Sequence, residues 1–107
     1  MIGNFILQKT HSGNLTGEFT NQLINFISTE SADLIEGQPK SFEGTYISTW
    51  RENNEAFLLT LTISALPNTA ESKFHLEWFT LENLLIYVGQ GFISNKALIG
   101  FYENVEN

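Results

Sequence analysis

Apolar and polar side chains alternate along most of this sequence, and this two-residue period is the feature that most constrains its fold. The period is that of a β-strand with one buried face. No window keeps apolar residues at the i, i+3, i+4 and i+7 positions of an amphipathic helix. The sequence therefore predicts an all-β chain. Its clearest strand has Phe57, Leu59, Leu61, Ile63 and Ala65 on one face and Thr60, Thr62 and Ser64 on the other.

The other strands are predicted from the same alternation and from turn-forming residues between segments. Residues 42–50 and 57–65 are expected to form a hairpin across the polar turn 51–55. Pro67 then ends the second strand, because proline cannot donate to a strand ladder. Residues 30–40, which include Gly37 and Pro39, are predicted to be a loop. The remaining predicted strands are residues 1–9, 15–21, 22–29, 73–79, 84–93 and 97–102.

About eight strands with short connections fit either a meander closed into a barrel or a sandwich of two sheets. We favour a single antiparallel up-and-down β-barrel, because eight such strands enclose an interior that side chains fill or that holds one small ligand. A chain of 107 residues is expected to form one domain, residues 1–107.

The charge and composition of the chain disfavour several classes of partner. The net charge is −7 and only five Lys and Arg residues are scattered along the sequence, so we expect neither nucleic acid nor a membrane as a partner. The absence of cysteine excludes disulfides and thiolate chemistry. Residues 1–7 lack a signal-peptide pattern, and no apolar stretch approaches the ~20 residues of a membrane-spanning helix. We expect a soluble protein, with the cytoplasm favoured and the compartment left open.

Few residues could support catalysis. His11 and His75 lie far apart, and neither has a second metal ligand at helical or hairpin spacing. His75 and Glu77 share the outward face of one strand, where a polar pair is the simpler interpretation. A small hydrolase or isomerase would require His75, Glu77 or Glu103 to lie in a cleft. We therefore expect a protein that is not an enzyme and that has no metal and no cofactor.

Three phrases in fixed order carry a more specific resemblance. Residues 15–21 (Leu-Thr-Gly-Glu-Phe-Thr-Asn) resemble the opening strand of the avidin and streptavidin family, where a Leu-Thr-Gly-x-Trp-x-Asn pattern supplies an aromatic residue and an asparagine to the biotin pocket. Residues 44–48 (Gly-Thr-Tyr-Ile-Ser) are similar to that family's third strand, whose tyrosine and serine or threonine bind the ureido group. Residues 74–78 and 87–90 are similar to strands five and six, which supply a pocket tryptophan and a closing aromatic residue.

The resemblance implies a non-enzymatic barrel that binds a small apolar or heterocyclic molecule, with biotin as one candidate. The alternation agrees, because Tyr46 and Ser48 share one face and Phe19 and Asn21 share another. Phe19 stands where the family has tryptophan, and Asn25 lies near the position of a family serine. The implied ligand-binding residues are the polar Asn21, Asn25, Tyr46 and Ser48 and the apolar walls Phe19, Trp50, Trp78, Tyr87 and Phe101.

The position of the last strand departs from the family's order. The chain ends just after the strand that corresponds to the family's seventh, whereas residues 1–7 precede the first-strand motif and have the look of the family's eighth. We therefore expect a rearranged order. In that order, residues 1–9 close the barrel beside both the 15–21 strand and the 97–102 strand.

Two interpretations of the interior remain open at this point. Aromatic residues on alternating strands can line a pocket, but they can also fill a narrow barrel completely. In the second case the chain would be a structural or interaction module without a ligand. Its outward apolar residues, Ile47, Phe79, Leu84 and Ile86, would then form a subunit interface, for example in a homo-oligomer.

Overall fold

A computed structural model of the chain describes residues 1–52, 54–67 and 72–105. Within these ranges no helix is long and apolar enough to cross a membrane. The described residues form eight strands, of which residues 15–21 and 73–79 have the predicted bounds. The strands are β1 (Ile2–Lys9), β2 (Leu15–Asn21), β3 (Ser28–Gly37), β4 (Gly44–Glu52), β5 (Glu55–Ala65), β6 (Lys73–Phe79), β7 (Leu85–Ser94) and β8 (Ala97–Asn104).

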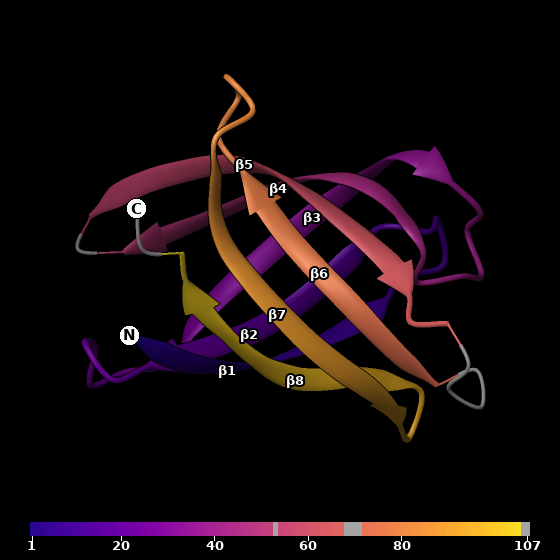
Figure 1. Cartoon of the computed structure of the whole chain (residues 1–107), viewed down its shortest axis with the longest axis horizontal. Helices are drawn as coiled ribbons and strands as arrows, with labels where there is room; N and C mark the ends of the chain where they lie inside the picture. The colour runs from indigo at the N-terminus through magenta and orange to yellow at the C-terminus, as the bar shows by residue number, and fades with distance from the viewer. Residues whose placement is uncertain (53, 68–71, 106–107) are drawn as a thin grey trace.

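Each strand pairs antiparallel with the next, and β8 pairs with β1, so the sheet closes into a barrel (Figure 1). This confirms the predicted all-β, eight-stranded, up-and-down barrel and excludes the two-sheet sandwich. The hairpin of β4 and β5 is also confirmed, with Tyr46 opposite Leu61. Two of the predicted turns include residues 53 and 68–71, which lie outside the described residues.

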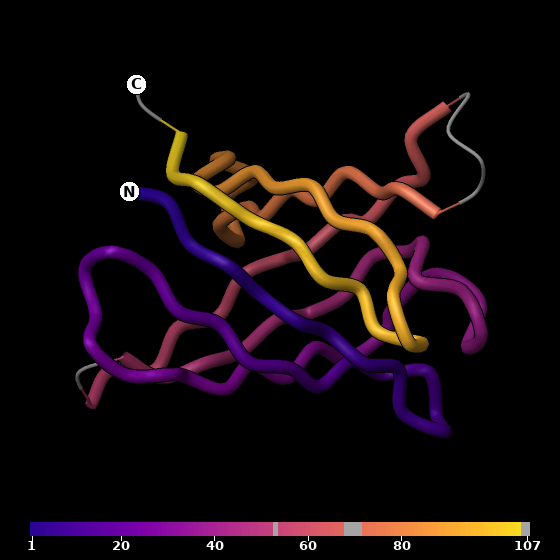
Figure 2. Tube along the Cα trace, turned by 90° about the horizontal axis from the view of Figure 1, so that it is seen from below, coloured from indigo at the N-terminus to yellow at the C-terminus, as the bar shows by residue number. Residues whose placement is uncertain are grey.

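The N-terminal strand closes the barrel, as the rearranged strand order predicted. Phe5 of β1 lies opposite Phe19 of β2 on one side and opposite Gly100 of β8 on the other. Figure 2 shows the indigo trace of β1 between the purple trace of β2 and the yellow trace of β8. Phe5 and Leu7 point into the core, where they are almost completely buried.

The third strand corrects the sequence prediction. Residues 22–29 were expected to form a strand and residues 30–40 a loop, but β3 runs from Ser28 to Gly37. In the first half of β3 the inward side chains are Ser28, Glu30 and Ala32. Because these side chains are small or charged, the sequence does not show the alternation of apolar and polar residues that predicts a strand. The ladders to β2 and β4 hold this segment extended in spite of its composition.

The two ends of the barrel differ. At one end Tyr46 is fully buried and its hydroxyl donates to the carbonyl oxygen of Phe42 at 2.8 Å. The rings of Phe42 and Phe74 pack there with centroids 6.2 Å apart, so this end is filled core. At the other end, which we call the mouth, β1 begins and β8 ends, with Ile2 opposite Glu103 (Figure 2).

Candidate functional site

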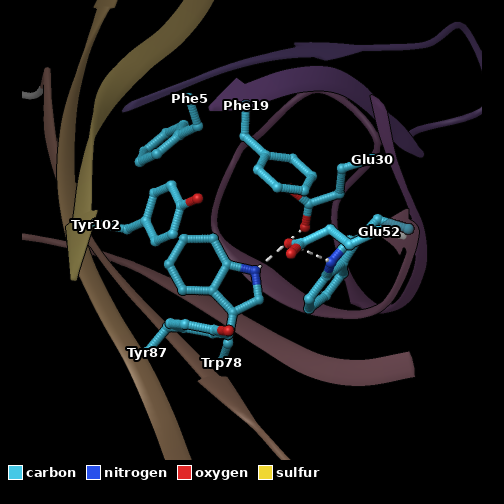
Figure 3. Close-up of a pocket in the computed structure, with 8 residues that line it drawn as sticks. Phe5, Phe19, Glu30, Glu52, Trp78, Tyr87 and Tyr102 are labelled. Carbon is cyan, nitrogen blue, oxygen red and sulfur yellow. Dashed lines mark hydrogen bonds between the residues drawn. The ribbon is translucent and has the colours of Figure 1, made fainter. Parts of the chain in front are cut away.

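A small cavity opens at the mouth of the barrel. Its volume is about 20 Å³, which is enough for one water molecule or a chemical group of similar size. It reaches the surface beside the half-buried side chains of Glu52 and Tyr87. Figure 3 shows it in close-up; it is lined by Phe5, Phe19, Glu30, Trp50, Glu52, Trp78, Tyr87 and Tyr102.

Four aromatic side chains from four strands form a closed ring, which we call the aromatic frame. Its successive ring centroids are 5.9 Å apart for Phe19 and Trp50, and 6.4 Å apart for Trp50 and Tyr87. They are 5.8 Å apart for Tyr87 and Tyr102, and 6.2 Å for Tyr102 and Phe19. All four contacts are edge-to-face, a geometry worth roughly 0.5–1.5 kcal/mol per pair beyond burial. The frame therefore holds its own shape.

Trp78 of β6 lies against one side of this frame. Its ring is 6.5 Å from that of Tyr87 and 5.9 Å from that of Tyr102, measured between centroids. Phe5 packs edge-on against the indole at 6.0 Å. The indole N–H is directed at a carboxylate of β3, as the dashed line in Figure 3 shows.

That carboxylate belongs to Glu30, whose side chain is only 5% exposed. Its Oε2 accepts hydrogen bonds from the hydroxyl of Ser48 and, at 3.2 Å, from Nε1 of Trp78. Burial raises the pKa of Glu30 above its ordinary value, and the two hydrogen bonds oppose that shift.

The second oxygen of Glu30 is Oε1, and its surroundings differ from those of Oε2. Within the described part of the chain, Oε1 receives no hydrogen bond. Every completely buried side-chain nitrogen or oxygen atom in that part has a hydrogen-bond partner, so Oε1 cannot be completely buried. Oε1 therefore keeps a small accessible surface, and Glu30 is one of the side chains that line the cavity. A donor that entered the cavity would find a carboxylate oxygen without a hydrogen bond in one of its lining side chains.

A second carboxylate, that of Glu52, lies at the rim. Its Oε1 accepts a hydrogen bond from Nε1 of Trp50 at 3.1 Å. Burial, and then the charge of Glu52, raise the pKa of Tyr87. Burial is also the main cause that raises the pKa of Tyr102 to about 12, and the charges of Glu52 and Glu30 add to it. Glu30 and Glu52 therefore bring two acidic groups to one small cavity.

Asn21 and Gly3 position Tyr102 rather than line the cavity. The amide nitrogen of Asn21 donates to the Tyr102 hydroxyl at 3.0 Å, and its oxygen accepts from the backbone N–H of Leu23 at 2.8 Å. A Cβ on Gly3 would lie 2.5 Å from the Tyr102 ring, so only glycine leaves room for the ring at this height of the barrel.

The structure brings together about half of the ligand-binding residues expected from the sequence. Phe19, Trp50, Trp78 and Tyr87 all line the cavity. Ser48 is fully buried and acts through its hydrogen bond to Glu30.

Three other expected residues lie elsewhere. Tyr46 points inward but belongs to the filled end of the barrel. Asn25 is exposed in the connection between β2 and β3, and Phe101 is 46% exposed on the outer face of β8. The expected inward positions of Asn25 and Phe101 are therefore wrong. The next residue, Tyr102, points inward instead. The pairing of β8 with β1 and β7 decides which of these two neighbouring aromatic residues faces the core.

The cavity also contains residues that sequence reasoning missed, namely Phe5, Glu30, Glu52 and Tyr102. Glu30 fell in a predicted loop, and Glu52 in a predicted turn. The spacing of Ser28, Glu30 and Ala32 is that of one strand face, and it is the signal that could have found Glu30.

The polar pair on β6 lies outside the barrel. His75 Nε2 and Glu77 Oε2 are 3.5 Å apart, and about a third of each side chain is exposed. Glu103 is also exposed, and none of these three residues lines the cavity. In the described ranges, no three His, Cys, Asp or Glu side chains gather in a group that could hold a metal ion.

The fold and the cavity together define a closed eight-stranded antiparallel barrel with an aromatic, acidic site at one end. Comparison with known protein families, with curated proteins and with solved structures found no match to this chain.

Proposed function

We propose that this protein binds a small molecule at the mouth of the barrel, without catalysing a reaction. The site has the composition typical of ligand pockets, namely apolar and aromatic walls with a few convergent polar groups. The observation that carries the proposal is Glu30. A carboxylate buried among aromatic rings costs stability, and a core of this size could be filled without it.

The ligand would enter between the half-buried side chains at the rim. The cavity of about 20 Å³ accepts only one small group as it stands. A ligand with a larger body would leave that body in the mouth, against Trp50 and Tyr87, or would displace Tyr87 and Glu52. Rearrangement of rim side chains is common when interfaces and pockets fill.

The resemblance to the avidin and streptavidin family keeps heterocyclic ligands, biotin included, among the candidates. Phe19, Trp50, Trp78 and Tyr87 supply the aromatic walls that the resemblance implies. The ureido contact implied for Tyr46 is replaced, however, by its bond to the Phe42 carbonyl oxygen at the opposite end. A heterocycle in this barrel would have to be bound through Glu30 and the groups around it.

Titration with biotin and with a fractionated metabolite pool tests the proposal. Both tryptophans of the chain line the cavity, so binding is expected to change the intrinsic fluorescence directly. A ligand at 100 times its Kd should also raise the free energy of unfolding by about 2.7 kcal/mol. The absence of any change in fluorescence or Tm across the whole pool would contradict the proposal.

A second candidate is an assembly module, and it is favoured by apolar side chains exposed on the outside of the barrel. Of the residues expected at a subunit interface, Leu84 is 56% exposed, and Ile47 and Phe79 are half-buried. Ile86, which was also expected there, packs against the core instead. Phe92 and Phe101 of the adjacent strands β7 and β8 are also exposed. Self-association would bury them. Light scattering over a wide concentration range tests this candidate, and a strict monomer throughout would remove it.

A further inference from the structure

The cavity combines aromatic rings with carboxylates, and this combination selects for the charge of a ligand. The centre of an aromatic face attracts a cation that approaches within about 6 Å. The aromatic frame and Trp78 surround the cavity, Glu30 lies inside it, and Glu52 lies at its rim. None of the eight lining side chains carries a positive charge.

We propose that the ligand of this site is a small primary amine, bound as its ammonium ion, with the ammonium group beside Oε1 of Glu30 and inside the aromatic frame. This inference rests on the proposed function and adds the chemical class of the ligand.

The size of the cavity favours a primary ammonium over a bulkier cation. An –NH₃⁺ group is close in size to a water molecule, and the cavity has room for about one such group. A trimethylammonium group is several times larger and would require the frame to open. The frame is braced by its four edge-to-face contacts and by the hydrogen bond from Asn21 to Tyr102, so opening it would cost several interactions.

The hydrogen-bonding capacity of Glu30 also fits an ammonium ion. Oε2 is occupied by two donors, from Ser48 and Trp78, whereas Oε1 has no donor among the described residues and belongs to a side chain that lines the cavity. An ammonium ion has three donors and no acceptor, so it complements a free carboxylate oxygen and the aromatic faces around it. The uncharged carbon skeleton of the amine would lie against Trp50 and Tyr87 at the mouth.

Anions are disfavoured at the same place. The charges of Glu30 and Glu52 both act on the Tyr102 hydroxyl, and the whole chain carries a net charge of −7. A carboxylate that entered the cavity would meet like charges in a water-poor setting. A neutral alcohol would escape this repulsion but would lack the attraction of the two carboxylates and of the ring faces.

Calorimetric titration at neutral pH with benzylamine, benzyl alcohol and benzoate tests the inference, because the three probes share a phenyl group and differ in charge. Benzylamine is expected to bind with a Kd at least about tenfold lower than either other probe. In the Glu30→Gln variant, benzylamine binding should weaken at least about tenfold, while benzyl alcohol binding changes little. Glu18→Gln, an exposed glutamate on β2, is the matched control and should leave benzylamine binding unchanged.

The other outcomes contradict, in turn, the amine inference, the position of the ammonium group at Glu30 and the proposed function. If benzyl alcohol or benzoate binds as tightly as benzylamine, the amine inference is wrong and small-molecule binding survives. If Glu30→Gln binds benzylamine as well as the control does, the ammonium group does not lie at Glu30. If no probe binds and the metabolite pool also gives no change, both the inference and the proposed function fail.

Discussion

Deletion of residues 1–9 is expected to abolish folding of the barrel. β1 supplies the core side chains of Phe5 and Leu7, which are 3% and 0% exposed, and it pairs with both β2 and β8. Loss of a large core side chain costs roughly 2–5 kcal/mol, and whole domains are stable by only about 5–15 kcal/mol. The deletion would also leave two unpaired strand edges, which favour aggregation.

Near-ultraviolet circular dichroism of the truncated chain measures this loss, because Trp50 and Trp78 lie in the packed interior. A synthetic peptide of residues 1–9, added in trans, should restore the signal by taking the place of β1. The same peptide with Leu7→Asp is the control and should not restore it, since it would bury a charge in the core. A truncated chain that unfolds cooperatively near the Tm of the intact protein would contradict the assigned closure.

Replacement of Glu30 by glutamine is expected to stabilise the free protein at pH values above the folded-state pKa of Glu30. We expect a gain of roughly 1–4 kcal/mol, by analogy with buried ion pairs that are replaced by apolar residues of similar volume. The glutamine oxygen can accept from Ser48 and Trp78 as the carboxylate does. The variant keeps the shape of the side chain and removes the cost of a buried charge. A gain in stability with a loss of amine binding is the pattern of a residue retained for function.

The pH dependence follows from the direction of the pKa shift. Burial raises the pKa of Glu30 in the folded state, so the folded protein binds more protons than the unfolded chain over the interval between the ordinary and the raised pKa. The stability that Glu30 contributes is present at low pH and is lost as the pH rises through the folded-state pKa. The difference between Glu30→Gln and the wild type should therefore be small at low pH and grow as the pH rises.

Urea unfolding of both proteins across a pH series measures that difference. Glu18→Gln is again the control, because its exposed side chain should give no comparable increase with pH. A Glu30→Gln variant that is less stable than the wild type at every pH would contradict the account, since it would mean that the buried charge stabilises the fold.

The sequence alone predicts the barrel because most strands carry their own evidence. In residues 59–63 of β5 and 74–78 of β6 the inward residues are apolar and the outward residues polar, so each strand and its face can be identified locally. The closing role of residues 1–9 was predicted from the resemblance, since residues 1–7 look like the last strand of the avidin and streptavidin family. These features depend on residues close together in the chain.

The candidate site could be predicted only in part, because its central residue depends on distant partners. Glu30 can be buried in β3 only because Ser48 of β4 and Trp78 of β6 supply its donors. No residue near position 30 in the sequence indicates that these two donors will lie beside it. At the end of β8, Phe101 and Tyr102 are adjacent aromatic residues, and only the pairing with β1 and β7 decides which one points inward.

The central claim, that an ammonium ion binds beside Glu30 within the aromatic frame, is tested most directly by the indole N–H signals in a two-dimensional NMR spectrum. The chain has two tryptophans, so Trp50→Phe assigns both signals. Saturation with benzylamine should shift the Trp78 signal, because this N–H donates to the carboxylate that would receive the ammonium group. Benzoate at the same concentration should leave it in place. A Trp78 signal that does not move when benzylamine saturates the protein would contradict the claim.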